Sequence, residues 1–318
     1  MLGMKKILIS LLAFILLLPA AACSNDKTRA DNRTGGYTFT DSEGVTVQLA
    51  EKPKTVAVLF SSYADIWECA GGKVDITVYE SVERGFAGED AVIVDSGSGH
   101  STIDLETLIA AKPDFVIGTA DYDSQCQAVE FCRSAGIPSA LFRVESFEDY
   151  LNMLDIFCSL TGKEENYQEY GVEVRQRIDW LLESLPENSE AAKILFVRAG
   201  SSANSTKAKT SGDNFACAML SQLGSVNIAD TDTTFTGTLS LEVIMQENPE
   251  YLFISTMGDE NAAKDYMNSQ LSSEGWRELE CVKNGNYYYL PKELFHYKPN
   301  SRWADAYEYL ASILYPEM

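Results

Sequence analysis

Three cationic side chains follow predicted strands in a chain that is otherwise strongly acidic. Arg143, Arg198 and Lys298 each come after a short apolar run rich in β-branched and aromatic residues. The sequence holds 47 acidic residues against 25 basic ones, a formal charge of −22. Guanidinium and ammonium groups gathered at strand ends suit carboxylates, propionates and other anionic groups. These residues therefore predict a pocket of local positive charge, although a surface salt bridge is the alternative for each arginine.

Aromatic side chains and a histidine occur in the same predicted loops, where they would supply flat walls and cation–π partners. Because imidazole and phenolate groups both ligate haem iron, His296 or Tyr297 is a candidate axial ligand. An ordinary polar loop residue is the alternative for His296. The only other histidine is His100, and such scarcity argues against a zinc or manganese site. The set comprises Tyr63, Tyr122, Phe235, Phe295, His296 and Tyr297.

No catalytic constellation accompanies these residues. Asp95, Ser98 and His100 have the residue types of a nucleophilic triad, but the chain lacks a G-x-S-x-G elbow. It also lacks the G-x-x-x-x-G-K-S/T phosphate loop and the zinc-binding H-E-x-x-H pattern. We therefore expect no enzymatic activity, no catalytic residue and no resident cofactor or metal. A hydrolase-like or adhesive secreted protein is the alternative class.

An alternation of strand and helix patterns must position these loops. Residues 37–49 alternate in polarity around the turn 41–44, which predicts a β-hairpin. Strand-like runs then alternate with helical stretches and predict an α/β fold with mostly parallel sheets. Ligands bind beyond the carboxyl ends of the strands in such sheets. The runs are 55–60, 91–94, 115–118, 139–142, 194–197, 251–254 and 286–290.

The segment 146–186 divides the α/β pattern into two halves. It has no strand signal and reads as helix throughout, apart from Thr161-Gly162. We expect an N-terminal lobe at 37–145, a linking helix at 146–186 and a C-terminal lobe at 187–318. About 295 residues after a leader suit two lobes better than one core.

The two predicted lobes repeat one motif. Leu105-Glu106 and Leu241-Glu242 each open a helical stretch, and each leucine stands eight residues before a proline. An acidic residue and a strand-like run follow the proline in both copies. This shared register favours duplication of one lobe over coincidence.

The N-terminus predicts export. Lys5 and Lys6 precede an apolar run from Ile7 to Leu18, which is shorter than the roughly 20 residues of a membrane span. The small residues before Cys23 resemble a bacterial lipobox, in which the cysteine is diacylated, with palmitate-like chains, and becomes the new N-terminus.

We expect residues 1–22 to be a lipoprotein signal peptide, Cys23 to carry the lipid and residues 23–36 to form a flexible tether. Ala20 departs from the leucine preferred there, and the alternative is an ordinary signal peptide cut after Ala22. Removing residues 1–22 takes away two lysines, which leaves 47 acidic and 23 basic residues, a formal charge of −24. A chain so acidic should bind no nucleic acid and should meet the membrane only through its lipid.

Several segments in fixed order resemble a known family, the substrate-binding lipoproteins of ABC importers for ferric siderophores, haem and cobalamin. They are Lys52–Leu59, Ala70–Val74, the Leu-Glu…Lys-Pro-Asp-Phe-Val-Ile stretch at 105–117, Leu160–Lys163, and the closing Trp303, Tyr307, Leu310 and Tyr315-Pro316. The similarity runs over nearly the whole chain after residue 36.

The resemblance implies a periplasmic-binding-protein fold of the single-helix hinge type: two Rossmann-like α/β lobes joined by one long α-helix, with the ligand between them. It implies a monomer on the extracytoplasmic face of the cell membrane, delivering a small metal complex to an ABC permease dimer with its ATPase subunits. A ferric siderophore is expected first, and haem or a corrinoid is the alternative. By motif position, Glu106 and Glu242 would dock arginines of the permease; the alternative is that both are merely first-turn helix acids.

Overall fold

The computed structural model describes residues 36–96, 102–186, 190–231 and 240–317. The chain opens with the predicted hairpin, in which β1 (Tyr37–Thr40) pairs antiparallel with β2 (Thr46–Leu49). The buried Asp41 side chain accepts hydrogen bonds from the turn amides of Glu43 and Val45, at 3.0 and 2.9 Å. Its second oxygen accepts one from the amide of Leu141, at 3.0 Å, so the turn is fixed to the first lobe.

The first lobe contains a five-stranded sheet in the order β5-β4-β3-β6-β7, and every pair in it is parallel. The predicted strands β3, β5, β6 and β7 are confirmed, whereas β4 has two residues and carries no pattern of its own. The strand order reverses between β3 and β6, which creates a crevice at their carboxyl ends. The elements are β3 (Val56–Val58), α1 (Ser61–Cys69), β4 (Ile76–Thr77), α2 (Tyr79–Glu83), β5 (Val92–Ile93), α3 (Leu105–Ala110), β6 (Phe115–Thr119), α4 (Asp123–Ser134) and β7 (Ser139–Phe142).

The second lobe repeats this arrangement with parallel strands in the order β10-β8-β11-β12, and the short β9 pairs antiparallel with β8. Its order reverses between β8 and β11, as in the first lobe. The strands are β8 (Lys193–Ala199), β9 (Lys207–Ala208), β10 (Val226–Asn227), β11 (Tyr251–Thr256) and β12 (Tyr287–Tyr289). The helices are η2 (Ala203–Ser205), α8 (Phe215–Gln222), α9 (Ile228–Thr231), α10 (Leu241–Glu247), α11 (Glu260–Leu271), η4 (Trp276–Glu278), α12 (Glu280–Lys283), α13 (Lys292–Phe295), η5 (Asn300–Arg302) and α14 (Trp303–Leu314).

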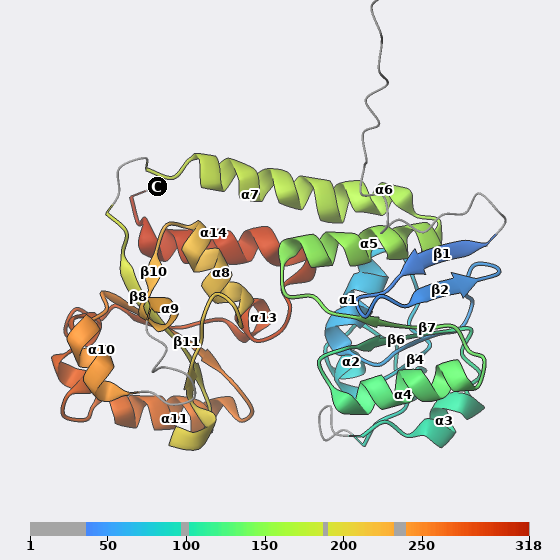
Figure 1. Cartoon of the computed structure of the whole chain (residues 1–318), viewed down its shortest axis with the longest axis horizontal. Coiled ribbons are helices and arrows are strands. Elements are labelled where there is room, and N and C mark those ends of the chain that lie inside the picture. Colours follow the sequence, from blue (N-terminus) through green and yellow to red (C-terminus); the bar gives the residue numbers. More distant parts are fainter. Residues whose placement is uncertain (1–35, 97–101, 187–189, 232–239, 318) are drawn as a thin grey trace, which may run out of the picture.

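The segment between the sheets forms two successive helical stretches. The first, α5 (Phe147–Thr161), begins at a capping box on Ser146 and ends at Gly162, whose φ of 66° is left-handed. The second is continuous through α6 (Glu164–Tyr167), the π-helical η1 (Gln168–Val172) and α7 (Glu173–Glu183). Figure 1 shows that α5 stays with the first lobe while the second stretch runs across both. The long connecting helix of the expected fold is therefore this second stretch.

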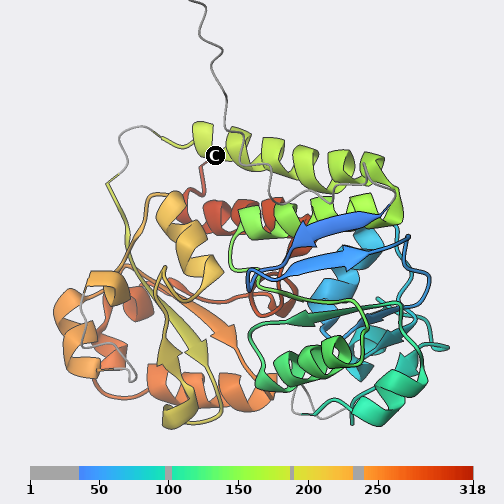
Figure 2. The same ribbon diagram turned by 45° about the vertical axis from the view of Figure 1, so that its right-hand side comes forward.

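Below α7 the lobes share one apolar core. Trp303, at the start of α14, is 2% exposed and contacts Phe147 of α5 and Phe215 of α8, with ring centroids 5.9 and 5.5 Å apart. The 45° turned view of Figure 2 shows α14, in red, beneath α7 and beside α5. Burying a large aromatic side chain is worth about 2–3 kcal/mol, so this junction resists separation of the lobes. Among the residues described, no helix is both long and apolar enough to cross a membrane.

Candidate functional site

A cavity of about 560 Å³ lies between the lobes, at the carboxyl ends of both parallel sheets. This is a usual volume for a site that takes a small molecule. The first lobe contributes the residues that follow β3, β4, β6 and β7, and the second those near the ends of β8, β11 and β12. The cavity is lined by Phe60, Ser62, Glu80, Asp121, Tyr122, Glu145, Arg198, Asp213, Asn214, Phe215, Met257, Gly258, Phe295, His296, Tyr297 and Lys298.

Arg198 is the cation available to a ligand in this cavity. It lies near the end of β8 and is half-buried. No hydrogen bond or ion pair joins its guanidinium to any residue that the structure describes. A half-buried, unpaired guanidinium can bind a carboxylate or another planar anion through two parallel hydrogen bonds.

Lys298 also lines the cavity, but its charge is already paired. Its Nζ lies 2.7 Å from Glu145 Oε1, and the lysine side chain is 13% exposed. Glu145 follows β7 in the first lobe and Lys298 follows α13 in the second, so the ion pair joins the lobes across the cavity. A ligand that approaches Lys298 must compete with Glu145.

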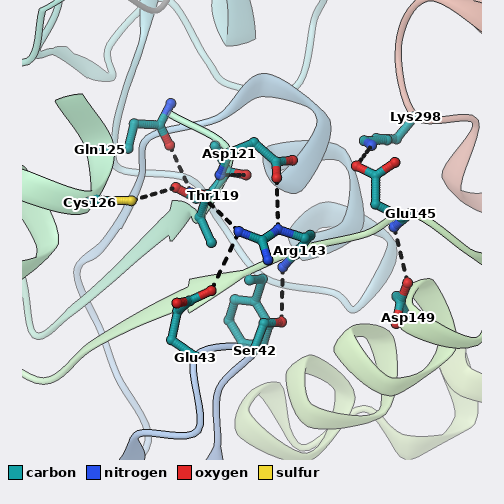
Figure 3. Close-up of polar contacts among 12 residues, drawn as sticks. Ser42, Glu43, Thr119, Asp121, Gln125, Cys126, Arg143, Glu145, Asp149 and Lys298 are labelled. Atoms are coloured by element: carbon teal, nitrogen blue, oxygen red, sulfur yellow. Dashed lines mark hydrogen bonds and ion pairs between the residues drawn. The ribbon is translucent and has the colours of Figure 1, made fainter. Parts of the chain in front are cut away.

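Arg143 does not reach the cavity, which corrects its prediction as a lining residue. Its Nε donates to Asp121 Oδ1 at 2.9 Å, and Nη2 lies 3.5 Å from Glu43 Oε1. Figure 3 shows the guanidinium among Asp121, Glu43 and the hairpin turn at Ser42. Arg143 is the first residue after β7, and its side chain is held at the hairpin side of the lobe, 47% exposed, by these acidic partners.

The prediction that three cations make the pocket positive is wrong, because the cavity wall carries both signs of charge. Four carboxylates line the same cavity, and each already accepts from another residue. The pairs are Glu80 with Ser61, Asp121 with Arg143, Glu145 with Lys298, and Asp213 with Lys209. Within the described part of the lining, Arg198 is thus the unpaired cation of a wall of mixed charge.

The predicted aromatic residues that the structure describes divide into three that line the cavity and one that does not. Tyr122, Phe295 and Tyr297 line the cavity. Tyr63 does not, because it is completely buried in α1 behind Phe60, with ring centroids 4.9 Å apart. Its hydroxyl donates to Phe142 O at 3.1 Å, and burial raises its pKa well above the usual range.

His296 lines the cavity from the second lobe. Burial lowers its pKa, and the positive charges of Lys292 and Arg198 lower it further. The imidazole is therefore neutral at pH 7, the form that can ligate a metal. Its ring packs edge-on against Tyr297, with centroids 5.0 Å apart. Across the part of the chain that the structure describes, no three His, Cys, Asp or Glu side chains gather to hold a metal ion.

Some predictions fall outside the described residues. They concern Cys23, Ser98, His100 and Phe235. Conversely, sequence reasoning missed Phe60, Glu80, Glu145 and Phe215 as lining residues. Glu80 follows β4, whose two residues give no periodic signal, and Phe215 opens α8, where its apolar side chain looks like ordinary core.

The predicted docking acids are both exposed near helix starts. Glu106 is the second residue of α3, where the side chain of Asp104 caps the helix by accepting from Glu106 N at 3.0 Å. Glu242 is the second residue of α10 in the other lobe. Figure 1 places α3 and α10 on separate lobes, both away from α7.

Two curated proteins of Bacillus subtilis (strain 168) are similar to the chain over most of their length. A putative ABC transporter substrate-binding lipoprotein, YhfQ, is 20% identical and is covered to 96%, with 95% of this chain matched. An iron-uptake system-binding protein is 21% identical, with 90% of each chain covered.

Solved structures share the fold at low identity. Staphylococcus aureus SirA complexed with staphyloferrin B has a TM-score of 0.66, 17% identity, and coverage of 87% of this chain and 98% of its own. The periplasmic haem-binding protein RhuT of Roseiflexus sp. RS-1 has a TM-score of 0.66 and 14% identity, covering 83% and 98%. The vitamin B12-binding protein BtuF of Vibrio cholerae has a TM-score of 0.65 and 19% identity, covering 83% and 97%.

A family model described as a periplasmic binding protein matches residues 56–294. The match spans both parallel sheets, the connecting helices and the cavity lining from Phe60 to Gly258. The chain belongs to the periplasmic binding protein family.

Proposed function

We propose that this chain is the extracytoplasmic solute-binding component of an ABC importer and that it captures its ligand in the cavity between the lobes. The observation that carries this proposal is the unpaired Arg198 beside aromatic walls, at the carboxyl ends of two parallel sheets. The chain binds and releases the ligand without altering it. The relatives support this role, because their names describe substrate binding for an ABC transporter and for iron uptake.

The proposed ligand is an iron complex, with a ferric siderophore as the first candidate. Arg198 suits an anionic arm of such a chelate, and Tyr122, Phe215 and Phe295 suit its flat or apolar parts. Haem is the second candidate because the neutral His296 lies in the cavity wall. A corrinoid is the third, supported by likeness to a vitamin B12-binding protein.

The proposed delivery depends on the lipid anchor and on one acidic residue in each lobe. Lipid on Cys23 would hold the protein at the outer face of the cell membrane and raise its effective concentration near the permease. Glu106 and Glu242, one on each lobe, would then orient the protein on a permease dimer that is served by ATPase subunits.

A titration of the purified chain tests the binding role. Isothermal calorimetry with a ferric catecholate, a ferric hydroxamate, ferric citrate, haem and cobalamin should give one saturable site for at least one of them. Arg198→Gln should weaken binding of an anionic ligand, and the absorbance spectrum of the complex then separates haem from a chelate. Absence of binding to the entire series would refute the metal-complex role.

A further inference from the structure

A second cation lies hidden beside the cavity. The Arg84 side chain is only 7% exposed, and its guanidinium lies between two aromatic rings. Cζ is 3.7 Å from the centre of the Tyr297 ring and 4.7 Å from that of Phe86. Burial lowers its pKa, which shows that the surroundings compensate only in part for the loss of water. A buried guanidinium whose pKa is shifted in this way, beside a cavity, is a candidate functional group.

The hydrogen bonds of Arg84 leave one edge of the guanidinium unused. Nη1 donates to Ser61 Oγ at 3.0 Å and lies 3.4 Å from Ser62 Oγ. Nε and Nη2 are both buried and donate to no described residue. The nearest carboxylate is that of Glu293, whose Oε2 lies 3.7 Å from Nη2, beyond hydrogen-bond distance. Nε and Nη2 together form the edge that binds a carboxylate through two parallel hydrogen bonds.

Arg84 also lines a second cavity of about 450 Å³, together with Glu83, Lys292, Glu293 and Tyr297. Tyr297 lines the main cavity as well, so its side chain is the wall between the two. Lys292 Nζ lies 5.2 Å from the centre of the same ring and adds a second positive charge. Glu293 is 55% exposed and also lies 3.6 Å from Arg302, so it can turn toward solvent without losing its counter-charge.

We propose that Arg84 is a second anion-binding residue, which grips a free carboxylate of the ligand when an arm of that ligand passes beside Tyr297. The inference rests on the proposed binding role and adds a ligand class: metal complexes that keep an uncoordinated carboxylate. Arg198 holds the ligand in the main cavity, and Arg84 holds the arm in the smaller one. Movement of the Tyr297 and Glu293 side chains exposes the edge of Arg84 without movement of the lobes.

Calorimetry with two ferric complexes tests this assignment. Ferric citrate carries free carboxylates, and ferrioxamine E is a neutral hydroxamate complex without any. Arg84→Met should weaken ferric citrate binding about 10- to 100-fold, the usual loss of a charge-assisted pair, and should change ferrioxamine E binding by less than twofold. The matched control Arg177→Met removes a surface arginine that pairs with Asp305 and Glu308 on α14, and it should change neither affinity.

Thermal unfolding distinguishes a role of Arg84 in ligand binding from a role in stabilising the contact between the lobes. Since Arg84 is buried with two unused donors, Arg84→Met should keep or raise the melting temperature. A lowered melting temperature with unchanged ferric citrate affinity would overturn the proposal. If Arg84→Met does not fold, Arg84→Lys keeps the charge without the bidentate edge and should show the same selective loss.

A readout on the unmodified chain completes the test. Diamagnetic gallium citrate should shift the Nε–H resonance of Arg84, and an unshifted resonance at saturation overturns the assignment. Failure of the wild-type chain to bind ferric citrate also overturns it. Binding of haem or ferrioxamine E in the same series would then leave the general binding role standing, so the two failures are distinguishable.

Discussion

Asn300 connects the lobes behind the cavity, and its removal should destabilise the whole molecule. It begins η5 in the second lobe and is completely buried. Its Nδ2 donates to Ser62 O at 2.7 Å and to Asp65 Oδ2 at 2.8 Å, both in α1 of the first lobe. Its φ of 52° lies in the left-handed region, which asparagine tolerates better than alanine does.

The expected loss follows from these contacts. The bond to a carboxylate contributes about 1.5–3 kcal/mol and the bond to a carbonyl about 1 kcal/mol. The left-handed backbone costs alanine about 1 kcal/mol more. Asn300→Ala should therefore lower the free energy of unfolding by roughly 3–5 kcal/mol. For a chain of this size, that is a fall of roughly 6–10 °C in melting temperature.

Urea unfolding followed by circular dichroism measures the effect, and Asn300→Gly is the matched control. Glycine loses the same two hydrogen bonds but accepts the left-handed φ, so it should be about 1 kcal/mol more stable than the alanine variant. A loss below about 1 kcal/mol for Asn300→Ala would show that this contact does not hold the lobes together. A glycine variant less stable than the alanine variant would refute the backbone part of the argument.

Three further outcomes are expected. Arg198→Gln should weaken an anionic ligand about 10- to 100-fold in calorimetry at unchanged melting temperature, whereas Arg177→Gln on the outer surface should leave affinity intact; equal affinities would contradict the role of the unpaired cation. Burial raises the pKa of the Asp65 carboxyl in the folded protein above its value in the unfolded chain. Protonation of Asp65 therefore stabilises the fold. This contribution to the free energy of unfolding is complete below the unfolded pKa and is lost as the pH rises through the folded pKa. Asp65→Asn should hence gain stability over the wild type in urea unfolding at pH 7, and the gain should vanish by about pH 4; a constant difference would refute the linkage. Changing Glu106 and Glu242 together to alanine should abolish cellular uptake without changing ligand affinity, and persisting uptake would leave them as ordinary helix-start acids.

The helices and strands of the fold could be predicted from the sequence because the patterns that specify them are local. Alternation around Asp41 predicted the hairpin, and apolar runs predicted most strands of both sheets. The long helical segment between the sheets was evident from its lack of strand signal. Contacts between segments distant in sequence, such as that of Asn300 with Ser62, leave no local pattern and were not predicted.

The site was predictable at the level of loops and less so at the level of side-chain direction. Lining residues lie at or beyond strand ends, as the sheet rule requires, and Arg198, His296 and Lys298 are among them. Arg143 was misplaced because it follows β7 in a loop, where its side-chain direction is decided by Asp121 and by the sequence-distant Glu43, which no local pattern reveals. Tyr63 belongs with Ile66 and Trp67 to an i, i+3, i+4 set on α1, and that spacing marks a buried helix face.

The core that the lobes share around Trp303 affects how ligand recognition should appear in kinetics. Because the lobes are packed together before the ligand arrives, binding requires side chains to move but does not require the lobes to close. The measured dissociation constant then carries no penalty for populating a rare closed arrangement of the lobes. Observed association rates should rise linearly with ligand concentration instead of levelling off at a rate of lobe closure. A permease that distinguishes loaded from empty protein would accordingly sense side chains and bound ligand at the rim of the cavity.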